Sequence, residues 1–201
     1  MMSAAEPSMG DRSDVRTMVG GGAKLGAITA VGVVVFALLS RVLSGRVETI
    51  VQSVLVVVGV VVFAYLPAVW VRPRGVDGIG WAALLGLLGA LAFTVVDTAV
   101  LRPVKLYHWT WDQIGGGSGF WYVSVWWMGS AFLAWLGAWV WTRAGGEGVG
   151  PRVGQTAGLG IVLFGIIVLT GILPFHAGTA ALAVTLGLVA TVPLAGSSRG
   201  A

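Results

Sequence analysis

Six long apolar stretches constrain this chain more than any other feature of its sequence. A helix needs about 20 apolar residues, at about 1.5 Å per residue, to cross about 30 Å of hydrocarbon. Only 10% of the residues are charged, against about a quarter in soluble domains. The sequence therefore predicts an all-α, polytopic integral membrane protein with six transmembrane helices in one bundle. The expected spans are about 25–44, 49–71, 78–101, 120–141, 156–174 and 177–195.

The segments outside these spans are short. Residues 1–23 mix acids, bases, Ser and Gly without an apolar core, and they lack the features of a signal peptide. We expect them to form a disordered cytoplasmic tail, residues 24–196 to form the six-helix domain, and residues 197–201 to form a second short cytoplasmic tail. The 32 glycines favour closely packed helices, because small residues let membrane helices approach each other. Such faces are also candidate surfaces for other membrane subunits or for self-association.

The positive charges favour an orientation with both termini in the cytoplasm, as in a bacterial inner membrane protein. In that orientation eight Lys and Arg residues lie inside and four outside. The inner residues are Arg12, Arg16, Lys24, Arg72, Arg74, Arg143, Arg152 and Arg199, and the outer ones are Arg41, Arg46, Arg102 and Lys105. They form no basic block, so a nucleic-acid partner is not expected. The chain has no cysteine, which excludes thiolate chemistry and cysteine-ligated metals.

Polar residues collect at the outer ends of the predicted spans. Because ionisable groups are costly within hydrocarbon, they usually pair, face the bundle or reach water. Asp97 and Asp112 are candidate catalytic acids or bases. The candidate ligand-binding residues are Arg41, Glu48, Asp97, Lys105, His108, Trp109, Trp111, Trp121 and His176.

Asp97 shares a helix face with small residues. Ala82, Gly86, Ala90 and Phe93 precede it at spacings of three or four, so its carboxylate is predicted to point into the bundle. Arg41 lies at a similar depth in the first span, and we hypothesise an ion pair between Arg41 and Asp97. The pair would either lock two helices together or form part of a site.

The two histidines leave two interpretations open. Two imidazoles on one side of a bundle can ligate haem iron or, with a carboxylate, a divalent metal. However, His108 and His176 are far apart in the sequence and match no metal-binding motif. We therefore predict interfacial histidines that bond to backbone or water, no metal site, and leave the cofactor unknown.

The stretch from Leu106 to Trp127 is rich in tryptophan and glycine. Tryptophan and tyrosine prefer the membrane interface, so an aromatic belt is expected where the fourth span begins. Farther along that span, Phe132, Trp135 and Trp139 recur at helical spacing. Another face carries a stripe of small residues, which are Ser130, Ala134 and Ala138. We expect the small face to pack and the aromatic face to meet lipid or a flat ligand.

Residues 97–135 resemble membrane-bound carotenoid hydratases and related carotenoid-synthesis proteins. Those proteins carry an acidic residue and a proline, then a Trp-x-Trp pair, then a glycine and aromatic stretch that leads into a tryptophan-containing helix. Val-Ser stands here where the family has Val-Pro followed by Asn, and the family's Glu and Gly signature in earlier helices is missing. The resemblance implies an isoprenoid-type ligand. The matching residues, in order, are Asp97, Pro103, Trp109, Trp111, Gly119, Trp121, Tyr122 and Trp135.

Two functions remain open from the sequence. The first is a non-catalytic structural or accessory subunit with a polar, tryptophan-rich pocket at its outer face, in contact with membrane lipids. The alternative is a membrane enzyme or binding protein that acts on a lipid or polyisoprenoid at the outer leaflet, with Asp97 or Asp112 as acid or base. A transporter is disfavoured, because the middle of the spans carries no charge and no continuous polar path.

Overall fold

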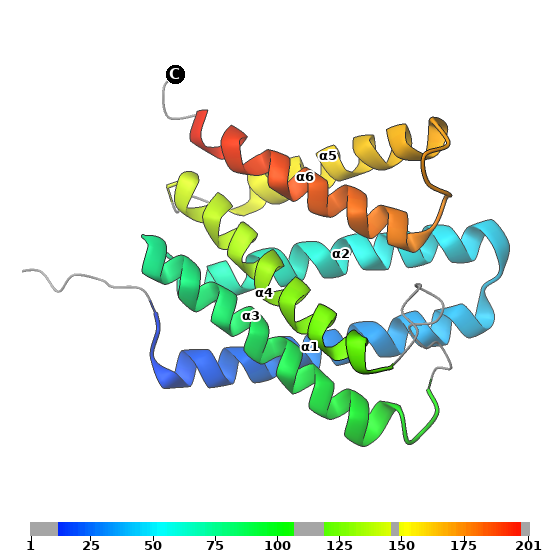
Figure 1. Cartoon of the computed structure of the whole chain (residues 1–201), viewed down its shortest axis with the longest axis horizontal. Coiled ribbons are helices and arrows are strands. Elements are labelled where there is room, and N and C mark those ends of the chain that lie inside the picture. The colour runs from blue at the N-terminus through cyan, green and yellow to red at the C-terminus, as the bar shows by residue number, and fades with distance from the viewer. Residues whose placement is uncertain (1–11, 107–118, 146–148, 198–201) are drawn as a thin grey trace, which may run out of the picture.

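The described residues of the computed structural model, 12–106, 119–145 and 149–197, form an all-helical bundle without strands (Figure 1). This confirms the predicted all-α class. The helices are α1 (Val15–Val42), α2 (Gly45–Val71), α3 (Val76–Val96), the π-helix η1 (Asp97–Leu101), α4 (Gly119–Arg143), α5 (Val149–Leu169) and α6 (Ala177–Ser197).

Five of the described helices are long and apolar enough to cross a membrane. They are α1, α2, α3 together with η1, α5 and α6. The prediction of an integral membrane protein is thus supported, although the count of six spans is supported for five helices only. The remaining helix, α4, carries many tryptophans, and their indole N–H groups make them less apolar than aliphatic side chains.

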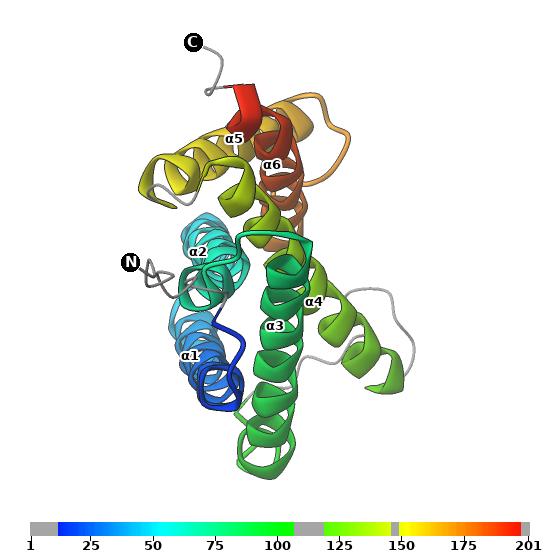
Figure 2. The same cartoon turned by 90° about the vertical axis from the view of Figure 1, so that its left-hand side faces the viewer.

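Consecutive helices run in opposite directions, so that α1 and α3 run in the same direction (Figure 1). α3 lies between α1 and α4 (Figures 1 and 2). α2 packs against α1, α4 and α6, and α5 packs mainly against α6. The short connection between α5 and α6 makes them the helical hairpin that the sequence predicts. The C-terminal ends of α1 and η1 lie at the same end of the bundle as the connection between α5 and α6, but at its opposite edge (Figure 1).

Glycines allow the closest of these contacts. A Cβ atom added to Gly137 of α4 would overlap the backbone carbonyl of Ala64 in α2. Between α5 and α6, a Cβ atom on Gly187 would lie 2.7 Å from the backbone nitrogen of Gly160. On α4 the stripe of Ser130, Ala134 and Ala138 is buried, as the sequence predicts. Small residues therefore set the helix separations.

The first helix begins ten residues before the predicted span, so the expected disordered tail is wrong for residues 15–23. Asp14 caps the helix: its carboxylate accepts hydrogen bonds from the Thr17 N–H at 2.9 Å and the Thr17 hydroxyl at 2.7 Å. These hydrogen bonds lower the pKa of Asp14 below its ordinary value. Met18 and Gly22 are buried, and a Cβ atom on Gly22 would lie 2.7 Å from Leu88 Cβ of α3. Packing thus extends the helix beyond its apolar stretch.

The fifth span is also displaced from its prediction, 156–174. The helix runs from Val149 to Leu169 and ends just before Gly171, whose φ of 72° lies in the left-handed region that glycine adopts without strain. The predicted tails at residues 1–11 and 198–201 lie outside the described residues.

Candidate functional site

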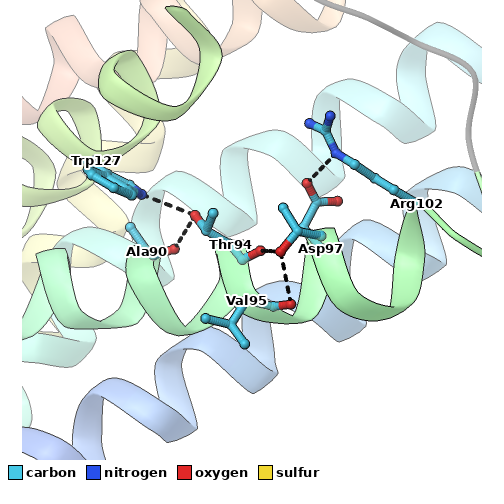
Figure 3. A network of polar contacts seen from close by, with 7 residues as sticks. Ala90, Thr94, Val95, Asp97, Arg102 and Trp127 are labelled. Atoms are coloured by element: carbon cyan, nitrogen blue, oxygen red, sulfur yellow. Dashed lines mark hydrogen bonds and ion pairs between the residues drawn. The ribbon is translucent and has the colours of Figure 1, made fainter. Parts of the chain in front are cut away.

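A fully buried carboxylate lies where α3 changes into a π-helix. Asp97 is 0% exposed and begins η1. The Arg102 N–H donates to the Asp97 carbonyl at 2.9 Å, the i to i+5 bond of a π-helical turn. The same turn brings the two side chains together on one side of the helix, so that Arg102 Nε donates to Asp97 Oδ2 at 2.9 Å (Figure 3). The π-helical turn thereby builds an ion pair within a single helix.

The pair is asymmetric in its exposure. The Asp97 side chain is fully enclosed, whereas the Arg102 side chain is 46% exposed. The residues that precede Asp97 on its predicted face are also buried, which confirms that this face points into the bundle; they are Ala82, Gly86, Ala90 and Phe93. An interfacial arginine usually packs its aliphatic stem against protein and keeps its charged head at the surface. The half-exposed side chain of Arg102 fits this arrangement.

The predicted pair between Arg41 and Asp97 is wrong. Arg41 Nη2 instead donates to the Lys105 carbonyl at 3.1 Å and to the Leu106 carbonyl. α1 extends as far as the segment that follows η1, so Arg41 meets carbonyls left open at the end of the helix rather than the carboxylate one turn earlier. Lys105 contributes its carbonyl, with φ at 52°, and its side chain is exposed.

Tryptophans at the start of α4 reach α3 one turn before Asp97. Trp127 Nε1 donates to Thr94 Oγ1 at 3.1 Å, and the Thr94 hydroxyl donates to the Ala90 carbonyl at 2.8 Å (Figure 3). The neighbouring Trp126 ring lies 5.7 Å from the Phe93 ring. Both indoles are half-buried, so they pack between helices in addition to any role in an interfacial belt.

Glu48 takes part in a separate polar link between α1 and α2. Gln52 Nε2 donates to Glu48 Oε1 at 2.9 Å and to the Ser40 hydroxyl at 3.0 Å. The Ser40 hydroxyl in turn donates to the Phe36 carbonyl. Glu48 is therefore part of a contact between helices and not of the Asp97 cluster.

His176 acts as a cap. Its Nδ1 accepts a hydrogen bond from the Gly178 N–H at 3.0 Å, at the start of α6. The segment between α5 and α6 lies at the opposite edge of the bundle from η1 (Figures 1 and 2). The interpretation of a histidine bonded to backbone is confirmed for His176. Among the described residues no three His, Asp or Glu side chains gather as a metal site would need.

The rest of the predicted pocket lies outside the described residues. This applies to His108, Trp109, Trp111 and Asp112, and the side chain of Trp121 is likewise outside them. That these residues line a polar pocket with Asp97 stays a prediction.

A second polar network, which was not predicted from the sequence, joins α2, α5 and α6. The Thr191 hydroxyl donates to the Gly187 carbonyl at 2.8 Å, so it accepts from Thr156, 3.0 Å away. Thr156 in turn accepts from the Tyr65 hydroxyl, 2.7 Å away. Each hydroxyl has one proton, so the chain runs in one direction, from Tyr65 to Gly187. The only sequence signal was hydroxyl groups within otherwise apolar spans.

The described polar groups therefore form separate clusters: the Asp97 and Arg102 pair, the end of η1 bound by Arg41, the link at Glu48, the cap at His176, and the Tyr65 chain. No protein-family model, curated protein or solved structure matches the chain.

Proposed function

We propose that this protein is a six-span, non-catalytic membrane subunit that binds another membrane helix through a glycine face on α5. This face consists of Gly150, Gly154, Gly158 and Gly165, spaced by four, four and seven residues. A Cβ atom added to any of them would meet no heavy atom of the described structure within 4 Å. Only 11% of the apolar stretch of α5 is buried, against 50% for that of α6. One side of α5 is thus open to the membrane.

A glycine on the opposite side of α5 provides a comparison for this open face. Gly160 lies on the packed side of α5, where a Cβ atom would come within 2.8 Å of Val184 in α6. The fold itself explains Gly160, whereas it does not explain the four open glycines. Glycine costs about 1 kcal/mol against alanine within a soluble helix, but glycines four residues apart favour close helix pairing in membranes. The open face therefore supports a binding role.

The polar residues at the end of the bundle where α1 ends and α6 begins also support a structural role. Arg41 binds backbone carbonyls, Glu48 binds Gln52 and His176 caps a helix. Each of these side chains uses its polar atoms to hold helices or helix ends, as expected in a subunit without a reaction of its own.

Association is expected to weaken about ten-fold, or about 1.4 kcal/mol, in Gly154→Leu and Gly158→Leu, because the leucine side chain would hold the two helices apart. The measurement is single-molecule photobleaching in bilayers for self-association, with mass spectrometry of co-purified membrane proteins for another partner. Gly32→Leu and Gly59→Leu are the matched controls, since both glycines are also open. Equal association of the α5 variants and these controls would contradict the proposal.

For the orientation, we propose that both termini are cytoplasmic in a bacterial inner membrane, with α4 as the remaining span. The antiparallel helices bring the basic residues near the start of α1, the end of α2 and the end of α4 to one side, which supports a cytoplasmic side there. A reporter fused to the C-terminus is expected to be active in the cytoplasm. Activity in the periplasm would rule this orientation out.

A second candidate is an enzyme or binding protein for a lipid or polyisoprenoid, and the π-helical turn at Asp97 favours it. π-Helical turns occur frequently at functional sites, and buried ionisable groups in membrane spans often have a function. Asp97 would be the acid or base, with Asp112 as a further candidate. Loss of a co-purifying lipid from a stably folded Asp97→Asn protein would favour this candidate over the first.

A further inference from the structure

Three aromatic rings and a guanidinium form a continuous strip along α4. The ring centroids of Phe132 and Trp135 are 6.1 Å apart, with 22° between the ring planes. Those of Trp135 and Trp139 are 4.8 Å apart. Arg143 Cζ lies 5.8 Å from the centroid of the Trp139 ring. Because Phe132 is 47% and Trp135 is 37% exposed, this aromatic strip forms part of the outer surface of the bundle.

The length of the aromatic strip matches one leaflet. From Phe132 to Arg143 a helix rises about 16 Å at about 1.5 Å per residue, and the hydrocarbon of one leaflet is about 15 Å thick. Arg143 is the last residue of α4, so with α4 as a span, as proposed above, it lies at the headgroup level. Phe132 then lies near the bilayer middle, deeper than the interfacial belt where aromatic residues usually gather.

Arg143 is held in place by two helices. A Cβ atom on Gly196 of α6 would lie 3.6 Å from Arg143 Nη1 and 3.9 Å from its Cδ, so the arginine stem lies along this glycine. The Arg143 guanidinium also lies over the Trp139 ring of α4. A guanidinium over the face of a ring does not use the N–H groups of its edge for that contact, and such an edge binds two phosphate oxygens at once.

We propose that the aromatic strip binds one anionic phospholipid of the leaflet at the C-terminal end of α4. The phosphate lies at Arg143 and an acyl chain lies along Trp139, Trp135 and Phe132. The positive charge of Arg143 selects the anionic headgroup, and the matched length selects a lipid of a single leaflet rather than a second membrane helix. This site is on α4, so it is independent of the association proposed for α5.

Native mass spectrometry tests the proposal on the full chain. The protein is reconstituted into vesicles of equal phosphatidylglycerol and phosphatidylcholine and then extracted in mild detergent. We expect retained phosphatidylglycerol to exceed phosphatidylcholine, and this preference to fall about five-fold in Arg143→Gln. Arg16→Gln, which removes an exposed arginine near the same end of the bundle, is the matched control and is expected to keep the preference.

Two further variants separate binding from folding. Arg143→Lys keeps the charge but loses the paired N–H groups, so an intermediate preference is expected. Phe132→Leu removes the ring farthest from the headgroup, and it is expected to lower the retention of both lipids without changing the preference. The proposal fails if Arg143→Gln keeps the full preference, or loses no more of it than Arg16→Gln does, while the melting temperatures of the variants match that of the native protein.

Discussion

Gly137→Ala is expected to lower the free energy of unfolding by about 3 kcal/mol or more, the upper part of the range for overpacked cores. The added methyl group would overlap the backbone carbonyl of Ala64, and a backbone atom has no rotamer by which to move away. α2 and α4 would have to separate along a contact that also includes Ala138. The effect is measured as the loss of melting temperature in mild detergent, or by steric trapping in bilayers.

Gly129→Ala is the matched control on the same helix. No heavy atom of the described structure lies within 4 Å of a Cβ atom there, so stability is expected to stay within about 0.5 kcal/mol or to rise slightly, because alanine favours the helix. Equal stabilities of the two variants would show that α2 and α4 are not in close contact at Gly137.

Arg102→Met is expected to cost about 3 kcal/mol, and Asp97→Asn about 1 kcal/mol. Removing one partner of a buried ion pair is expensive when the charge left behind is buried. Asp97 is 0% exposed, whereas the Arg102 side chain is 46% exposed and keeps access to water or headgroups. The loss of the arginine therefore costs more than the loss of the charge on the aspartate.

Thermal unfolding of both variants and of the double variant, Arg102→Met with Asp97→Asn, measures this asymmetry. The double variant is expected to be more stable than Arg102→Met alone, because the buried charge has been removed. If Asp97→Asn lowers the stability more than Arg102→Met does, the difference in burial between the two side chains does not determine the cost of breaking the pair.

The helices were largely predictable because apolar length and face periodicity are local properties. The periodicity of Ala82, Gly86 and Ala90 placed Asp97 on a buried face, and it is buried. The start of α1 was not predictable from hydropathy, because residues 15–23 are held by the Asp14 cap and by the close approach of Gly22 to α3. Contacts with another helix thus extended a segment whose own composition is mixed.

The partner of Asp97 could not be predicted from the same helical periodicity. In a regular α-helix, residue 102 lies about 140° around the axis from residue 97, so helical periodicity does not indicate Arg102 as the partner of Asp97. The hypothesis of Arg41 was based on similar depth alone. Nothing in the letters DTAVL indicates a π-helical turn. The hydrogen bonds from Tyr65 to Thr156 and Thr191 could not be predicted for a related reason, since they depend on the relative rotation of three helices.

The π-helical turn also affects how this chain aligns with others. A π-helical turn holds one residue more than the α-helical turn it replaces, so η1 is equivalent to a single inserted residue within 97–101. A relative with an unbroken α-helix would present the same ion pair as an aspartate followed four, rather than five, positions later by an arginine. An alignment of the two needs a one-residue gap inside a membrane helix, where gaps are normally penalised most heavily.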